Sequence, residues 1–291
     1  MRRAQGSVRL AVMLLACATA YPGAALARTR SAKGTPALHS SSVYVLDEAD
    51  SSVLLSRQSD VAMPIASITK LMTALVVLEG GQPLDEQIEI TADDRDGPRN
   101  SGSRLVIGTT LSRSDLLHLA LMASENRAAH ALGRSYPGGL PACVAAMNAK
   151  ARSLGMTNSH FVEPTGLSSD NVASSEDLAK MVLAAAQVPT IQLYSTDSSY
   201  AVPVRSHLVE FRNTDSLVRN PTWNIVVQKT GYIAAAGRCL VMKAVFEGRA
   251  VVIVLLDSVG KYTRVADAVR IRKWMEANVA ANALRAVTTK V

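Results

Sequence analysis

Ala66-Ser67-Ile68-Thr69-Lys70-Leu71-Met72-Thr73-Ala74 is the stretch from which the fold of this 291-residue chain can be worked out. Apolar residues recur at helical spacing from Leu71 to Leu78, and Gly80-Gly81 follows them. This pattern predicts a helix that begins near the start of the quoted stretch and ends before the two glycines. Ser67 and Lys70 are three residues apart at the front of that helix, so their side chains share one face and can reach each other.

A serine paired with a lysine in this way can act as a nucleophile. The hydroxyl needs a base, and a lysine can be that base if burial or a nearby cation holds it neutral. The helix N-terminus also favours negative charge developing at Ser67. The same spacing occurs again in Ser258-Val259-Gly260-Lys261, which we interpret as a turn after a strand. The pattern therefore needs support from the rest of the chain.

Strand patterns lie near both ends of the chain. Val43–Leu46 and Val53–Leu55 flank an acidic turn and predict a hairpin. Three more strands are predicted near the C-terminus, over Ile225–Val227, Leu240–Met242 and Val251–Leu256. Between them the pattern is helical. Strands at both ends with helices between them predict an α+β fold whose sheet joins the N- and C-terminal segments.

Helical patterns cover 111–154, with breaks near Ser124 and at 136–139, and continue over 174–187, where Ser174 is placed to cap the helix. A closing helix is predicted over 265–277. The polar segment from Asp93 to Arg104 is expected to be an exposed loop. We therefore predict one domain over 42–280 with a helical subregion at roughly 91–190, preceded by a flexible leader (28–41) and followed by a tail (281–291).

The N-terminus has the features of an export signal. Met1 to Arg9 carries three arginines and no acid, a short apolar stretch follows, and Ala25-Leu26-Ala27 offers a small-x-small cleavage pattern. We predict a signal peptide over 1–27, removed on export to the periplasm. Leu14-Leu15-Ala16-Cys17 leaves open the alternative of a lipoprotein acylated at Cys17.

Composition excludes several classes of protein. With 48% hydrophobic residues the chain is not disordered, and beyond the N-terminus no apolar run is long enough for an integral membrane anchor. The net charge of +7 becomes +4 once the predicted signal is removed, so binding to nucleic acid is not expected. We interpret Cys143 and Cys239 as buried free thiols, with a disulfide as the alternative. No cluster has metal-ligand spacing, so we expect no metal and no cofactor.

Two further motifs follow Ser67 and Lys70. Lys229-Thr230-Gly231 comes directly after a predicted strand, where a cation, a hydroxyl and a residue without a side chain can bind a carboxylate and a substrate backbone. The other motif has two candidates, Ser124-Glu125-Asn126 at a helix break and Ser169-Asp170-Asn171 in a loop. Each supplies a hydroxyl for proton relay and an amide for a substrate carbonyl.

In this order the three motifs resemble the signature set of penicillin-binding proteins and serine β-lactamases. That family places the second motif between helices, which favours Ser124. The resemblance covers Ser42 to Ala277 and implies a β-lactamase/transpeptidase-like fold, an antiparallel sheet flanked by helices plus an all-helical subdomain. Leu121–Ala128, Pro164–Leu167 and Lys229–Met242 are most similar to the D-alanyl-D-alanine endopeptidases of the penicillin-binding protein 7 type. Ile233-Ala234 departs from that branch, which usually has polar residues there.

The resemblance implies a role for each motif residue. Ser67 is the acylated nucleophile, Lys70 its base and Ser124 the proton relay to the leaving amine, while Lys229 would help to lower the pKa of Lys70. The residues implied in substrate binding are Asn126, Lys229, Thr230, Gly231, Tyr232 and Arg264. Among these, the N–H of Tyr232 would form the oxyanion hole with that of Ser67, and Arg264 would bind a carboxylate.

The implied activity is hydrolysis of D-alanyl-diamino acid cross-links in peptidoglycan, with β-lactam antibiotics as covalent inhibitors. A D-alanyl-D-alanine carboxypeptidase is the first alternative, because the same residues would serve both reactions. A serine β-lactamase is the next, although Glu163-Pro164-Thr165-Gly166-Leu167 lacks the glutamate–asparagine setting of class A enzymes, so we interpret Glu163 as a loop residue. A peptidoglycan sensor without turnover is the last.

Overall fold

The computed structural model describes residues 34–95 and 102–288, with side chains up to residue 278. The predicted signal peptide, Cys17 and the first part of the predicted leader lie outside these ranges. The helices are α1 (Thr69–Glu79), α2 (Arg113–Met122), α3 (Asn126–Arg134), α4 (Gly139–Ser153), α5 (Ser175–Ala185), α6 (Pro189–Thr196) and α7 (Thr263–Thr288), with shorter turns η1 (Ala66–Ile68), η2 (Ala92–Asp94) and η4 (Ser216–Arg219).

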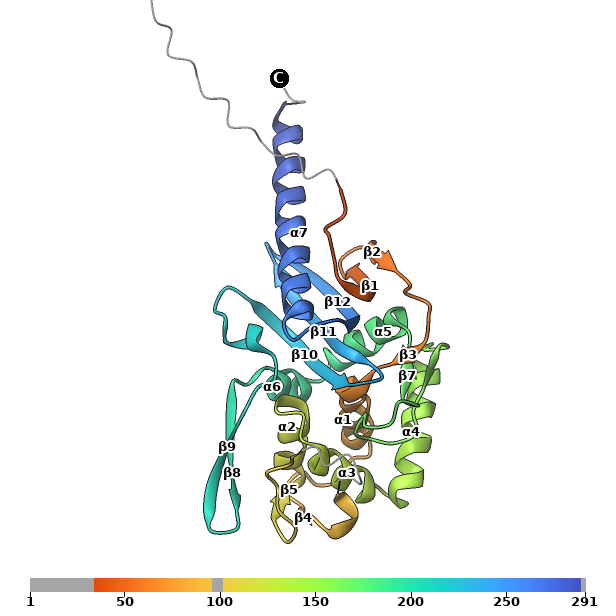
Figure 1. Ribbon diagram of the computed structural model, residues 1–291, viewed down its shortest axis with the longest axis vertical. Helices are drawn as coiled ribbons and strands as arrows, with labels where there is room; N and C mark the ends of the chain where they lie inside the picture. Colours follow the sequence, from red (N-terminus) through yellow and green to blue (C-terminus); the bar gives the residue numbers. More distant parts are fainter. Residues whose placement is uncertain (1–33, 96–101, 289–291) are drawn as a thin grey trace, which may run out of the picture. The chain divides into compact units, whose positions relative to one another are not determined.

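A five-stranded antiparallel sheet joins the two ends of the chain (Figure 1). Its strands are β1 (Ser40–Asp47), β2 (Val53–Arg57), β10 (Asn224–Ile233), β11 (Gly237–Phe246) and β12 (Arg249–Ser258). Their order is β10-β11-β12-β1-β2, so β1 pairs directly with β12 and β10 is an edge strand. The predicted α+β fold, with N- and C-terminal segments in one sheet, is confirmed.

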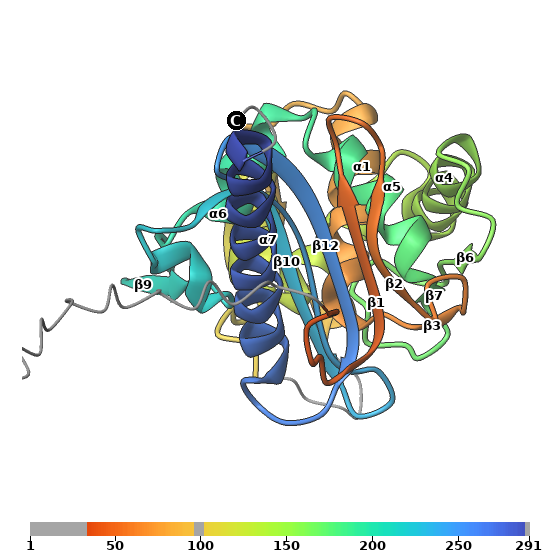
Figure 2. The ribbon, with the colours of Figure 1, turned by 90° about the horizontal axis from the view of Figure 1, so that it is seen from above.

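Both faces of the sheet are covered by helices. Alternate residues of β11 and β12 point to opposite faces of the sheet. Because both faces are buried, each strand is a nearly continuous run of apolar residues. On one face Leu240 and Ile253 pack with Ala268 and Ile271 of α7, which lies along the sheet in Figure 2. On the other face the sheet packs with α1 and α5 in a larger core that extends into the helical region.

The helical region follows the predicted breaks. α2 ends before Ser124, α3 begins at Asn126, and Gly138, with φ of +85°, precedes α4 in the left-handed conformation that glycine adopts most easily. The side chain of Ser174 accepts from the backbone N–H of Asp177 and caps α5, as expected. This packing places the start of α1, the α2–α3 break and the edge strand β10 around one site.

Several elements were not predicted. These are α6, the hairpin β8 (Ser199–Val204) and β9 (His207–Arg212), the short pair β4 (Gln87–Glu89) and β5 (Thr110–Ser112), and the strands β3 (Met63–Pro64), β6 (Ser159–His160) and β7 (Val172–Ala173). α7 also runs to Thr288 rather than ending at 277, because no glycine or proline interrupts 278–288. β1 begins at Ser40, inside the segment predicted as a leader.

Of the exposed loop predicted from Asp93 to Arg104, residues 96–101 lie outside the described ranges. Asp93, Arg95 and Arg104 are exposed as expected, whereas Asp94 is not. Its side chain is buried, where one carboxylate oxygen bonds His130 Nδ1 at 2.8 Å and the other accepts from Arg134 Nη2 at 2.9 Å.

Cys143 in α4 and Cys239 in β11 are both buried free thiols, as predicted, and burial raises the pKa of each, to about 11 and about 12. Within the described part of the chain, no helix is both long and apolar enough to cross a membrane.

Candidate active site

Ser67 lies in the turn η1 that leads into α1, as the motif predicted. Ala66, directly before it, has φ of +49°, a conformation that is strained for a residue with a side chain. The strained turn is held by Thr69, whose hydroxyl donates to the carbonyl oxygen of Ala66 at 2.8 Å. Ser67 itself is half-buried. The turn therefore places the hydroxyl at the end of a rigid helix while leaving it accessible.

Lys70 is fully buried and its amine lies against Ser67. Its Nζ donates to Ser67 Oγ at 2.9 Å, to Asn126 Oδ1 at 2.7 Å and to the carbonyl oxygen of Thr165 at 2.5 Å. These three acceptors come from three different parts of the chain. Together they hold the amine at the serine hydroxyl, which is the geometry that a general base for Ser67 requires.

Ser124 and Asn126 lie at the break between α2 and α3. Ser124 has φ of +60°, and such strained backbone in a residue other than glycine is common at functional sites. Glu125 caps α3 by accepting from the N–H of Arg127 at 3.3 Å, and it also accepts from Ser103 Oγ at 2.5 Å. The strained break thus directs Asn126 toward Lys70, and Ser124 lies two residues before Asn126 in the same break.

The alternative second motif, Ser169-Asp170-Asn171, has a different environment. Asn171 Oδ1 accepts from the backbone N–H of Val162 at 2.7 Å, and its Nδ2 donates to Glu163 Oε1 at 2.6 Å. Asn171 is fully buried. Its amide therefore holds a loop together, and Asn126, not Asn171, bonds to Lys70.

Lys229, Thr230 and Gly231 lie within β10, which continues two residues beyond the motif to Ile233. A side chain on Gly231 would put its Cβ 2.9 Å from the carbonyl oxygen of Ile65 and 3.1 Å from Ser67 N. The edge strand can therefore approach the Ser67 turn this closely only because Gly231 has no side chain.

Lys229 is fully buried, and its pKa is lowered well below the usual value, first by burial and then by the charges of Lys70 and Arg264. The buried carboxylate of Asp215 opposes this, and burial raises the pKa of Asp215 in turn. Lys229 Nζ donates to the carbonyl oxygen of Thr230 at 2.9 Å. Three basic side chains thus share this region with one acid, and their mutual repulsion would be relieved by a bound anion.

Arg264 lies in the first turn of α7, close enough to Lys229 for its charge to affect the pKa of that residue. Burial first, and then the neighbouring charge of Arg238, lower its pKa, while Asp215 opposes this. Two of its guanidinium nitrogens, Nε and Nη1, are buried and have no hydrogen-bond partner among the described residues. A buried donor without a partner is costly, so these nitrogens are suited to a carboxylate that a ligand would supply.

Glu163 organises the loop that faces Lys70, in agreement with its interpretation as a loop residue. Its Oε2 accepts from the N–H of Thr165 at 2.6 Å, and its Oε1 accepts from the N–H groups of Gly166 at 2.6 Å and Ser168 at 3.3 Å. Gly166 has φ of +83°, and a Cβ there would lie 2.0 Å from the carbonyl oxygen of Ala66. Both carboxylate oxygens are therefore engaged within the loop.

Two further residues, Thr165 and Thr214, belong to the site and were not predicted from the sequence. The first is Thr165, which contributes only a backbone oxygen to Lys70, so its side chain gives no signal beyond the adjacent Gly166. The second is Thr214, whose hydroxyl lies 2.6 Å from that of Thr230 and whose N–H donates to the carbonyl oxygen of Met122 at 3.1 Å. Thr214 therefore connects the end of α2 to β10.

Lys261, from the second Ser-x-x-Lys match, lies in an exposed turn after β12, as predicted.

Comparison with known proteins agrees with this geometry. The model of the peptidase S11 family, D-alanyl-D-alanine carboxypeptidase, matches residues 29–260. The chain belongs to this peptidase family. Two relatives named D-alanyl-D-alanine endopeptidase are similar to this S11 peptidase, one from Pseudomonas aeruginosa at 48% identity and one from Escherichia coli at 44%. The matches cover 82% and 92% of this chain, and 78% and 88% of the relatives.

Two solved structures have the same fold as this S11 peptidase. The Streptomyces K15 DD-transpeptidase superposes with a TM-score of 0.77 at 25% identity, over 85% of this chain and 99% of that one. A D-alanyl-D-alanine carboxypeptidase from Mycobacterium tuberculosis superposes with a TM-score of 0.77 at 28% identity, over 84% and 93%. The penicillin-binding fold expected from the motifs is thereby confirmed, and so is a serine DD-peptidase as the class of enzyme.

Proposed function

We propose that this S11 peptidase hydrolyses D-alanyl-diamino acid cross-links in peptidoglycan through an acyl-enzyme on Ser67. The observation that carries the proposal is the placement of Lys70 Nζ, 2.9 Å from Ser67 Oγ and held there by Asn126 and Thr165. A nucleophile, an oriented base and a neighbouring cationic pocket are the parts that acyl transfer from a carboxylate-bearing peptide needs.

In the first step, neutral Lys70 accepts the proton of Ser67 as the hydroxyl oxygen attacks the D-alanine carbonyl carbon. The N–H groups of Ser67 and Tyr232 would stabilise the oxyanion, and the close approach of Gly231 to Ser67 brings β10 into position for this. The C–N bond then breaks, and the proton held by Lys70 passes through Ser124 to the leaving amine. Asn126 would hold the amide on the acyl side. Water attacks the ester in the second step and regenerates the Ser67 hydroxyl.

The substrate carboxylate next to the scissile bond would bind between Thr230 and Arg264. Thr230 is supported by the hydroxyl of Thr214, and Arg264 offers guanidinium nitrogens that lack a protein partner among the described residues. The amine of Lys229, which is fully buried, lies in the same region. In a cross-link this carboxylate belongs to the D-centre of the diamino acid, and in a pentapeptide to the terminal D-alanine.

Because the same carboxylate occurs in both substrates, the catalytic residues serve endopeptidase and carboxypeptidase reactions equally. The endopeptidase proposal is supported by relatives of that name at 48% and 44% identity. The carboxypeptidase is the second candidate, supported by the name of the family and by a Mycobacterium tuberculosis relative so named at 31% identity.

A β-lactamase is disfavoured, because both oxygens of Glu163 bond groups of its own loop and so do not position a deacylating water. Penicillin would instead remain bound to Ser67 as an inhibitor. We place the enzyme in the periplasm, where the predicted export signal would deliver it and where its peptidoglycan substrate lies.

The test is digestion of purified cross-linked muropeptide dimers and of pentapeptide monomers, with products identified by mass spectrometry. We expect wild type to convert dimers to monomers and the Ser67→Ala variant to leave them intact. Release of D-alanine from pentapeptides while dimers persist would identify a carboxypeptidase instead. If neither substrate changes although penicillin acylates Ser67, the endopeptidase proposal is wrong.

A further inference from the structure

The proposed carboxylate pocket continues along the sheet toward the β10–β11 turn. Thr230 pairs across the sheet with Leu240, whose side chain packs beneath α7. Because side chains alternate along a strand, Tyr232 lies on the same face two residues further on, opposite Arg238. Tyr232 and Arg238 therefore lie beyond Thr230 on its own face of the sheet.

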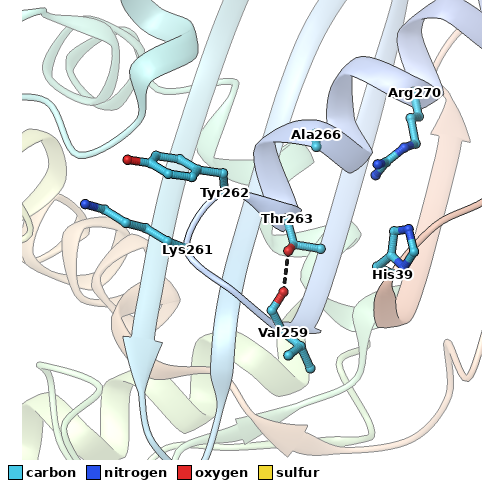
Figure 3. Close-up of a pocket in the computed structure, with 7 residues that line it drawn as sticks. All are labelled: His39, Val259, Lys261, Tyr262, Thr263, Ala266 and Arg270. Atoms are coloured by element: carbon cyan, nitrogen blue, oxygen red, sulfur yellow. Dashed lines mark hydrogen bonds between the residues drawn. The ribbon is translucent and has the colours of Figure 1, made fainter.

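β12 ends at Ser258, which pairs with Arg238, so Lys261 and Tyr262 follow at the same end of the sheet. Four residues, Tyr232, Arg238, Lys261 and Tyr262, form two aromatic–cation pairs here, and we call them the outer rim. Arg238 Cζ lies 4.4 Å from the centre of the Tyr232 ring, and Lys261 Nζ lies 5.3 Å from that of Tyr262. The two tyrosines are 56% and 70% exposed. Figure 3 shows Lys261 and Tyr262 pointing together from the loop before α7, away from His39 and Arg270.

The two cations of the outer rim, Arg238 and Lys261, have no ion-pair partner among the described residues. Arg238 lies close enough to Arg264 for the two charges to repel, since it contributes to the lowered pKa of Arg264. An anion that extends from Arg264 to the outer rim would relieve this repulsion.

The two candidate substrates differ on this side of the scissile bond. A pentapeptide releases D-alanine, which ends at the carboxylate assigned to Thr230 and Arg264. A cross-link releases the amine of a diamino acid whose other end belongs to a second stem peptide, with further carboxylates and peptide groups. This leaving strand has to continue past Arg264, and the outer rim lies beside that residue.

We propose that the outer rim is a subsite for the anionic leaving strand of a cross-link. Arg238 and Lys261 pair with its carboxylates, and the rings of Tyr232 and Tyr262 pack against its peptide groups. This subsite rests on the proposed function, because it serves the same reaction. Pentapeptides and penicillin do not reach it, so it favours cross-linked substrates over both.

The test compares the double variant Arg238→Gln/Lys261→Gln with the control Arg152→Gln/Lys273→Gln, which removes the same charges at exposed sites elsewhere. KM and kcat are measured with a purified muropeptide dimer and with pentapeptide, together with the rate of acylation by penicillin. We expect the rim variant to raise KM for the dimer roughly three- to tenfold with kcat unchanged. Its pentapeptide KM and penicillin acylation should match those of the control.

Salt provides a second measurement that does not depend on the variants' folding. Raising NaCl from about 50 mM to about 500 mM should increase the dimer KM of wild type by a larger factor than its pentapeptide KM. Equal dimer KM in the rim variant and the control, or equal salt dependence for both substrates, would overturn the subsite. A wild type that cleaves no dimer would instead contradict the proposed function itself.

Discussion

Lys70 Nζ donates to the backbone carbonyl oxygen of Thr165 at 2.5 Å, which ties the proposed general base to a loop far from it in sequence. The position of that oxygen depends on Glu163, which accepts from both the N–H and the hydroxyl of Thr165. Thr73 adds a second connection between α1 and the loop by donating to the carbonyl oxygen of Pro164 at 2.7 Å. The loop is therefore part of the device that orients Lys70.

The first prediction concerns Glu163→Ala, which removes the acceptor for this loop. We expect the free energy of unfolding to fall by about 2–4 kcal/mol, because several charge-assisted hydrogen bonds are lost together. Acylation of the folded protein by penicillin should slow by at least about tenfold, since Lys70 is no longer held. Denaturant unfolding and stopped-flow acylation measure the two effects. Glu89→Ala, at an exposed position, is the control, and equal acylation rates in the two variants would refute the role of the loop.

A second prediction concerns Gly231→Ala. The added methyl group meets backbone atoms of Ile65 and Ser67, which cannot move aside as a flexible side chain would. β10 should therefore shift outward, and kcat/KM should fall by about 100-fold, because a shift of the order of 1 Å misplaces the reacting groups. Gly108→Ala is the control, because it strains the backbone at φ of +86° in open space. That variant should lose about 1 kcal/mol of stability and keep its acylation rate, and a normal rate in Gly231→Ala would contradict the argument.

Arg264→Met separates binding from stability. The substitution removes a partly buried cation with unpaired nitrogens, so the free energy of unfolding should stay the same or rise by about 1 kcal/mol. In contrast, KM for carboxylate-bearing peptides should rise by about 10- to 100-fold. Thermal unfolding and steady-state kinetics on one preparation test both parts. A strong loss of stability with unchanged KM would show that Arg264 is structural.

Asp94 should make stability depend on pH in the acid range. Burial acts to raise its pKa, but hydrogen bonds from His130, Arg134 and the backbone of Thr91 outweigh this and lower it to about 2. A carboxyl with a depressed pKa stabilises the fold above its unfolded value of 3.8, and that contribution, about 2 kcal/mol, is lost as pH falls toward about 2. Asp94→Asn should therefore be less stable than wild type at pH 7 and approach it near pH 2. Urea unfolding across this range is the measurement, and a constant difference would contradict the assignment.

Much of the fold follows from sequence periodicity. The apolar run Val251–Leu256 has the length of a strand buried on both faces, and it forms the centre of β12 between β11 and β1. In contrast, β8 and β9 form a two-stranded hairpin that contains Pro203 and many exposed side chains, so it gives little hydrophobic signal. α6 was missed for a similar reason, because only Ile191 and Ser195 of its eight residues are buried.

The candidate site was predictable where chemistry lies in side chains and hidden where it lies in the backbone. Ser67, Lys70 and Asn126 are recognised by type and spacing, and the structure brings them into direct contact. Thr165 acts through a carbonyl oxygen, which every residue has, so no sequence pattern identifies it. Asp94 was assigned to an exposed loop for the opposite reason, because its partners His130 and Arg134 lie on a helix about 40 residues away.

The most direct test of the central claim is the intact mass of the protein after incubation with penicillin, followed by peptide mapping of the adduct. We predict one penicilloyl group per chain, carried by the peptide that contains Ser67, and no adduct on Ser67→Ala. Lys70→Met, which keeps the serine but removes the base, should acylate slower by several orders of magnitude. An adduct that persists in Ser67→Ala, or one that maps to Ser124 or Ser169, would contradict the assignment of Ser67 as the nucleophile.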